Sequence, residues 1–160
     1  MPAQADAEMA KVRAFLANAL KQLVLEINRE LRQNGSPGTP VDTGHARANW
    51  VPSVGRPFEQ EVDGTSGAAA SSGIAEVLAF KLGDGWLYVS NNVPYIQQLN
   101  RGHSKKAPAL FVEQCVARAQ ATIERKLEVS FGRLEVWNDG GGAAADNLAS
   151  AYSPFGGDDD

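Results

Sequence analysis

The chain has 160 residues, of which 43% are apolar, and its formal net charge is -4. This length suits one domain with its own hydrophobic core, and the single cysteine, Cys115, excludes an intramolecular disulfide bond. The N-terminal residues lack a basic segment followed by an apolar run, and nowhere do about 18 apolar residues follow one another. We therefore expect no export signal, no membrane span and a chain that is cytosolic when it is synthesised.

The first predicted element is a long amphipathic helix from Asp6 to Gln33. Its apolar residues recur at spacings of three and four, the periodicity of one helical face; they are Met9, Val12, Leu16, Leu20, Leu23, Ile27 and Leu31. Further apolar residues widen this stripe, namely Phe15, Ala19 and Val24. Such a helix is roughly 40 Å long and is expected to end at Asn34 and Gly35. The length of this helix and the width of its apolar stripe predict packing against more than one neighbour.

A loop rich in proline and glycine, Ser36 to Gly44, follows this helix. Within it, Asp42 and Thr43 carry side-chain oxygens that can cap the helix that comes next. The sequence HARANW therefore predicts a short turn of helix at residues 45–50.

The middle of the chain predicts two strands and a helix. Trp50 to Val54 is expected to be extended, and Pro52 confines that strand to a sheet edge or a bulge. Phe58 to Val62 is expected to return as a second strand. The small, polar stretch from Gly64 to Gly73 predicts a loop, and Ile74 to Leu82 predicts a short helix.

The next segment, Trp86 to Asn92, has the β-branched and aromatic content of a strand, which we expect to be the central one. Pro94 to Leu99 predicts one or two helical turns. Pro108 suits the first turn of a second long helix, whose apolar face comprises Phe111, Val112, Cys115, Val116, Ala119, Ile123 and Leu127. Phe131 to Trp137 alternates enough to predict a last strand.

The C-terminal stretch, residues 139–160, is rich in glycine and carries five aspartates and no basic residue. Subtracting these five charges from the net charge of -4 leaves +1 for residues 1–138. A nearly neutral body argues against general nucleic-acid binding, which needs a broad basic face. The acidic tail cannot bury enough surface to fold alone, so we expect it to be flexible.

Basic residues gather in the loop NRGHSKKAPALF, where Arg101, His103, Lys105 and Lys106 fall within six residues. This loop could be a catalytic site, a phosphate cradle or a joint between subunits. GHSKKAP does not match the G-x-x-x-x-G-K-[ST] pattern of a phosphate loop. A helix that begins at Pro108 could still hold an anion at its free N–H groups, although an exposed loop is the more common reason for such a cluster.

Neither a metal site nor a catalytic centre is predicted. A zinc site needs about four well-placed ligands, whereas His45, His103 and Cys115 stand at no recognisable spacing. Nucleophilic catalysis needs a nucleophile beside a histidine and an orienting acid, but Ser104 is merely next to His103 in sequence. Cys115 on an apolar helix face is a small buried hydrophobe. The tryptophans are expected to pack in the core or on a sheet face; they are Trp50, Trp86 and Trp137.

Two motifs occur in a fixed order ahead of the second long helix, PVDTGHARANW and VSNNVPYIQQLNRGHSKKAP. Together they resemble the neck or tail-completion proteins of long-tailed bacteriophages, which are small subunits that join head to tail. The resemblance covers roughly Pro40 to Ile123. Its first motif comprises Asp42, Thr43, Gly44, Arg47 and Trp50. Its second motif comprises Asn91, Asn92, Pro94, Tyr95, Gly102, Lys105, Ala107 and Pro108, with Lys106 beside them in the basic loop. His45 departs from the pattern, because an arginine is usual there.

The fold class expected for the chain is α+β, with the two long helices packed on a small, mostly antiparallel sheet in residues 1–138 and a flexible tail in residues 139–160. The resemblance implies a virion structural protein without catalytic activity, cofactor or metal. It implies a homo-oligomer, a hexameric ring at the phage neck or upper end of the tail, which is built in the host cytoplasm. Expected partners are head-closure, tail-terminator or tail-tube proteins, with DNA passing through the ring lumen and no membrane. The alternatives are a nucleic-acid-binding module that uses residues 101–106 and, third, a hydrolase.

Overall fold

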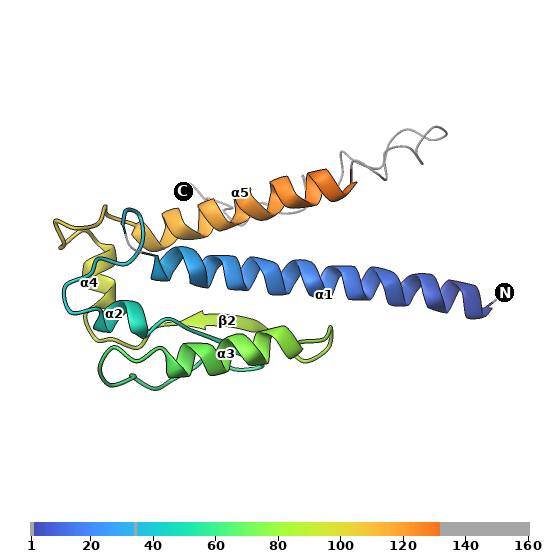
Figure 1. Cartoon of the computed structure of the whole chain (residues 1–160), viewed down its shortest axis with the longest axis horizontal. Helices are drawn as coiled ribbons and strands as arrows, with labels where there is room; N and C mark the ends of the chain where they lie inside the picture. Colours follow the sequence, from blue (N-terminus) through green and yellow to red (C-terminus); the bar gives the residue numbers. More distant parts are fainter. Residues whose placement is uncertain (1, 34, 132–160) are drawn as a thin grey trace, which may run out of the picture. The chain divides into compact units, whose positions relative to one another are not determined.

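The computed structural model describes residues 2–33 and 35–131, and it confirms the α+β class (Figure 1). The elements are, in order, α1 (Pro2–Arg32), α2 (His45–Ala48), β1 (Val51–Val54), α3 (Ala68–Ala79), β2 (Leu87–Ser90), α4 (Ile96–Asn100) and α5 (Phe111–Phe131). The chain divides into two compact units, Met1–Lys126 and Leu127–Asp160, and the description below concerns the first. The tail expected at residues 139–160 and its boundary lie outside the described residues.

The predicted long N-terminal helix is confirmed as α1, which ends at Arg32. Arg29 and Arg32 lie in its last turn, where positive charge is favourable beside the negative end of the helix dipole. Gly35 follows with a φ of 102°, a left-handed conformation that favours glycine. Within the described ranges, no helix combines the length and the apolar character that crossing a membrane requires.

The sheet has two antiparallel strands, β1 and β2, with Val51 opposite Ser90 and Val54 opposite Leu87. Each strand of such a pair is an edge, so Pro52, which has no N–H to donate, is tolerated in β1. The prediction that the strand near residue 88 is central is therefore wrong for the described sheet. The short helices predicted at residues 45–50 and 94–99 are confirmed as α2 and α4.

The strand predicted at Phe58 to Val62 is wrong, because side-chain amides occupy the backbone groups that a neighbouring strand would need. Asn49 donates from Nδ2 to the carbonyl of Val62 (3.0 Å) and accepts the Val62 N–H at Oδ1 (2.6 Å). Asn92 donates to the carbonyls of Phe58 (2.7 Å) and Gln60 (3.1 Å). This segment is consequently held as an ordered loop.

Helix α3 begins at Ala68, inside the stretch that predicted a loop as far as Gly73. Gly73 lies inside α3, at the point where this helix packs closely on β1. A Cβ atom at this position would lie 1.9 Å from the backbone oxygen of Pro52, so a larger residue has no room. The glycine that suggests a loop in the sequence is a contact point between helix and strand.

Helix α5 begins at Phe111, and the predicted start at Pro108 is wrong. Asn100 at the end of α4 fixes the start, because its side-chain oxygen accepts the N–H of Val112 (2.9 Å) and its carbonyl accepts the N–H of Leu110 (2.6 Å). Leu110 takes a left-handed φ of 58° to make this turn. Of the predicted last strand, Phe131 belongs to α5 and residues 132–137 lie outside the described ranges.

The core gathers around one face of α5 and the C-terminal end of α1. Its buried cluster comprises Leu31, Trp50, Ala107, Phe111 and Cys115. Trp50, 6% exposed, and Cys115, fully buried, confirm their predicted places in the core. Trp86 does not, since it is 78% exposed. Its carbonyl accepts the N–H of Gly55 (2.8 Å) just before β2, but its side chain does not belong to the core cluster. Trp137 lies outside the described residues.

Candidate functional site

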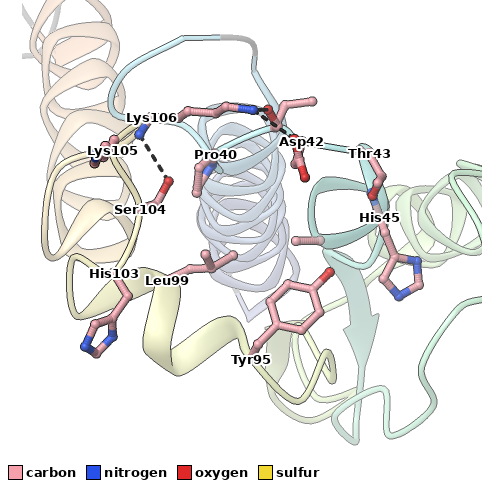
Figure 2. A pocket seen from close by; sticks show the side chains of 13 residues that line it. Pro40, Asp42, Thr43, His45, Tyr95, Leu99, His103, Ser104, Lys105 and Lys106 are labelled. Carbon is pink, nitrogen blue, oxygen red and sulfur yellow. Dashed lines mark hydrogen bonds and ion pairs between the residues drawn. The ribbon is translucent and has the colours of Figure 1, made fainter.

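The two sequence motifs meet at one cleft of about 460 Å³ (Figure 2). The first motif supplies the loop before α2 and the start of that helix, and the second supplies α4 and the basic loop that follows. The lining residues are Pro40, Val41, Asp42, Thr43, Gly44, His45, Ala46, Tyr95, Leu99, His103, Ser104, Lys105 and Lys106. The cleft therefore draws together two segments that are far apart in the chain, Pro40 to Ala46 and Tyr95 to Lys106.

Lys106 connects the two motifs directly. Its Nζ donates to Oδ1 of Asp42 (3.0 Å) and to the carbonyl of Val41 (3.1 Å), as Figure 2 shows for the ion pair. The Lys106 side chain is 58% exposed and that of Asp42 92%, so the ion pair is worth only about 0.2 to 1 kcal/mol. At the other end of the residue, the Lys106 N–H is accepted by the hydroxyl of Ser104 (3.1 Å). The contact fixes the position of the basic loop more than it adds to stability.

Asn91 makes a second connection, and this one is better shielded. Its Nδ2 donates to the carbonyl of Ala46 in α2 (2.8 Å), while its Oδ1 accepts the N–H of Val93 (3.1 Å). Asn91 thus joins the end of β2 to the first motif, and the neighbouring Asn92 holds the loop after β1. The asparagines of the second motif act on the backbone of other segments.

The turn before α2 depends on Gly44, whose φ of 89° lies in the left-handed region. The cap expected from Asp42 and Thr43 is only partly found. The Thr43 hydroxyl accepts the N–H of His45 (3.3 Å), but the Asp42 carboxylate faces Lys106 instead of the helix. The helix itself is anchored at its far end by Asn49, whose Nδ2 also donates to the carbonyl of His45 (3.0 Å).

His45 contacts acceptor groups with both of its ring nitrogens. Nε2 lies 2.8 Å from Oε1 of Glu61, and Nδ1 lies 2.7 Å from the carbonyl oxygen of Gly64. Only an imidazolium carries a proton on both nitrogens, so this arrangement favours the charged ring. The Glu61 carboxylate, then the Gly64 carbonyl, and more weakly Asp63 raise the pKa of His45 above its usual 6.5. His45 can therefore hold a positive charge in a pH-dependent way.

Arg47 of the first motif lies in α2, and Trp50 lies between α2 and β1 and is buried in the core. The indole Nε1 of Trp50 donates to the hydroxyl of Thr39 (2.7 Å), which donates to the carbonyl of Leu31 (2.6 Å). Arg47 is partly buried near Arg32, whose pKa is lowered by burial and by the Arg47 charge. Trp50 is thus a structural residue that joins α1 to β1.

The remaining residues of the second motif divide into turn formers and exposed groups. Gly102 has a φ of 91°, as its predicted turn requires, and Pro108 is partly buried in the loop before α5. Tyr95 is 41% exposed and, in Figure 2, lines the cleft on the side opposite Lys106. Pro94 and Lys105 are exposed. The Lys105 side chain has no hydrogen bond or ion pair with the part of the chain that the structure describes.

Asn49 and Thr39 are the structural residues of this region that the sequence analysis missed. Each has one short polar side chain that satisfies several backbone or side-chain groups at once. Only neighbouring residues could have pointed to them. Asn49 follows a four-residue helix, and Thr39 stands between a glycine and a proline. Neither position shows from sequence alone which distant segment it binds.

Among the described residues, no hydrogen bond joins His103 to Ser104 or to Cys115. Burial, and more weakly Glu30, raise the pKa of Cys115 to about 11, so this thiol stays protonated near neutral pH. The imidazole of His103 bonds to the carbonyl of Gln98 (3.0 Å), and the Ser104 hydroxyl is engaged with the Lys106 amide. Across residues 2–33 and 35–131, no group of three or more His, Cys, Asp or Glu side chains could hold a metal ion.

Comparison with protein-family models, with curated proteins and with solved structures finds no match for this chain. The two motifs, their convergence on one cleft and the exposed surfaces around it are therefore the observations from which a function is inferred.

Proposed function

We propose that this chain is a non-catalytic structural subunit of a virion, which assembles into a hexameric ring at the neck or the upper end of the tail of a long-tailed bacteriophage. The ring joins the head to the tail. The observation that carries this proposal is the meeting of the two motifs: Lys106 binds Asp42, and Asn91 binds the backbone of Ala46. Motifs that resemble a head-to-tail joining protein thus build one surface feature and not two unrelated ones.

Some residues of the motifs shape the backbone and others are exposed to solvent, and this difference supports an assembly role. Gly44, Trp50 and Asn91 shape the backbone around the cleft, as the contacts above describe. Tyr95 and Lys105 remain exposed at its edge and offer an aromatic ring and a positive charge. An exposed aromatic ring suits recognition of another protein, and an exposed charge can set the register and the rate of encounter.

The basic loop after α4 is, in this proposal, a joint that faces an acidic surface on a neighbouring subunit or on the next ring. Lys106 is already bound within the subunit, so Lys105 and Arg101 are the cations that would reach across. Exposed ion pairs contribute about 0.2 to 1 kcal/mol each, so they set the register and the rate of encounter while apolar contacts supply most of the binding. Repetition around a ring multiplies this small contribution.

The neighbours in the particle are head-closure, tail-terminator or tail-tube proteins, and DNA passes through the ring lumen. The subunit is made in the host cytoplasm and ends in the virion.

A joining assay tests this proposal. Heads and tails are purified from a phage that carries a nonsense mutation in this gene, and the purified protein is added back. We expect the full chain to restore joined, infectious particles. A variant with Asn91→Ala, which loses the better shielded of the two connections between the motifs, should restore few. Full joining without the added protein would contradict the proposal.

Nucleic-acid binding is the second candidate, because Arg101, His103 and Lys105 are exposed on one loop. A duplex-binding module would lose affinity steeply as salt rises, and it would do so without forming rings. Fluorescence anisotropy with a short DNA duplex at several salt concentrations separates the two functions.

A further inference from the structure

The apolar stripe of α1 is divided between the core and the solvent. Near the C-terminus of the helix, Val24 is 9% exposed and Leu31 1%. Nearer the N-terminus the stripe is exposed, with fractions of 53% for Met9, 50% for Val12, 47% for Leu16 and 41% for Leu20. We call these four residues the N-terminal stripe. Figure 1 shows this part of α1, in dark blue, running on past β2 and α3.

Three of the four residues of the N-terminal stripe have the spacing of a coiled-coil seam. With Met9 at heptad position a, Val12 falls at d and Leu16 at the next a. Four large apolar side chains that are each about half exposed on one helical face need a partner surface. A helix of the same kind, which presents the same seam, is the partner that this spacing fits.

The charges beside the seam indicate how two copies would lie. In this heptad Glu8 occupies position g and Arg13 position e. In a parallel, in-register pair of helices, g of one helix faces the following e of the other, so Glu8 of one copy meets Arg13 of the next. Among the described residues Glu8 pairs only with Lys11 (2.8 Å), and both side chains are more than half exposed, so this contact is easily exchanged.

The width of the apolar surface suits more than one neighbour. Phe15, 37% exposed, lies at position g, and Leu20 lies at position e. Apolar residues on both flanks of a seam allow a helix to touch one neighbour on each side, as in a closed ring, whereas a simple pair needs only positions a and d.

We infer that the N-terminal stripe is the surface through which copies of this chain associate, with their α1 helices parallel and in register. This inference deepens the proposed function and rests on its statement that copies of the chain form the ring.

Sedimentation velocity of the full chain tests the surface. Leu16→Glu places a charge in the seam and is expected to weaken association at least about tenfold, with an unchanged melting temperature. The matched control is Leu78→Glu, which makes the same change at a leucine of α3 that is 57% exposed, and which should assemble like the unaltered chain. If Leu16→Glu assembles normally, or lowers the melting temperature without affecting association, the stripe is covered by the chain itself and the inference is overturned.

Disulfide cross-linking tests the orientation. Cys115 is fully buried, so an added cysteine is the only reactive thiol among the described residues. Leu16→Cys lies on the seam and should form a disulfide between copies, whereas Asn18→Cys, two residues on and on the opposite face, should not. Equal cross-linking at both positions, or none at either in an assembled sample, would overturn the parallel arrangement.

These experiments also separate the inference from the proposed function. If Leu16→Glu and Leu16→Cys behave as expected but the protein joins no heads to tails, the interface stands and the proposed function fails. If rings and joining persist in Leu16→Glu, the proposed function stands and the interface is overturned. A chain that stays monomeric in every condition contradicts both.

Discussion

The ammonium group of Lys106 lies 3.0 Å from a carboxylate oxygen of Asp42, across 64 residues of sequence. The contact changes what can be expected of the basic loop, because Lys106 is bound inside the subunit, whereas Lys105 has no such partner among the residues that the structure describes. A charge on Lys105 is available to a neighbour, whereas a charge on Lys106 holds the loop in place. Substitutions at these positions should therefore have different effects.

Reversing the charge of Lys105 should impair assembly without affecting folding. Lys105→Glu removes an exposed cation that has no partner in the described structure, so its melting temperature should equal that of the unaltered chain. Ring formation or particle joining should fall, most clearly at low salt, where charges are least screened. Lys106→Glu, the comparison, brings a second carboxylate to Asp42 and should also lower the free energy of unfolding, by about 1 kcal/mol or less. Normal joining by Lys105→Glu at low salt would rule the loop out as the joint.

Stability should depend on pH through His45. Its pKa is raised in the folded chain, chiefly by Glu61, so the stabilisation is complete below the unfolded pKa near 6.5 and is lost as the pH rises through the folded pKa. The free energy of unfolding should thus decrease above about pH 6.5. Urea titrations at a series of pH values measure this slope.

Two variants identify the group responsible for that slope. His45→Arg keeps a positive charge at all these pH values and should flatten the profile, while His103→Gln, at the only other histidine, should leave it unchanged. A profile that is the same in His45→Arg and in the unaltered chain would show that another group is responsible.

Gly73→Ala should destabilise the fold although alanine is the better helix former. The added Cβ would lie 1.9 Å from the oxygen of Pro52, which is backbone and cannot move aside easily. We expect a loss of about 1 to 3 kcal/mol in the free energy of unfolding. Ser72→Ala, at an exposed position of the same helix, is the control and should be neutral or slightly stabilising. An equally neutral Gly73→Ala would mean that α3 does not pack on β1 as described.

Asn49→Ala should release the loop after β1. The substitution removes three hydrogen bonds and leaves the Val62 N–H without its acceptor. A loss of about 1 to 3 kcal/mol is expected, together with faster proteolytic cleavage between residues 55 and 64. Gln120→Ala, exposed on α5, should show neither effect. Unchanged cleavage in Asn49→Ala would show that other contacts hold this loop.

Periodic features of the chain were predictable from sequence. The stripe of α1 and the apolar face of α5 follow the period of a helix, which residues three and four apart reveal. The strands near Val51 and Leu87 were equally visible from their composition. The loop at Phe58 to Val62 was not predictable. Its sequence suggests a strand, but its backbone is bound by the side chain of Asn49.

The candidate site was predictable as two motifs but not as one cleft. Sequence order does not show that Lys106 turns back to Asp42, because the contact depends on how α4 and α2 are placed by the core. Similarly, the start of α5 is decided by Asn100, which lies eight residues before Pro108. The residues next to the helix start favour Pro108 as its first residue instead. Trp86 was misplaced for the same reason, since the position just before β2 lies outside the core although its composition resembles that of a strand.

The central claim is that copies of this chain close into a ring. Electron micrographs of the purified protein, sorted into class averages, test it most directly. The account predicts closed rings with six-fold symmetry and an open lumen, and it predicts that Leu16→Glu abolishes them while Leu78→Glu does not. Single subunits at all protein concentrations, combined with salt-sensitive binding to a DNA duplex, would contradict the account and favour a nucleic-acid-binding module.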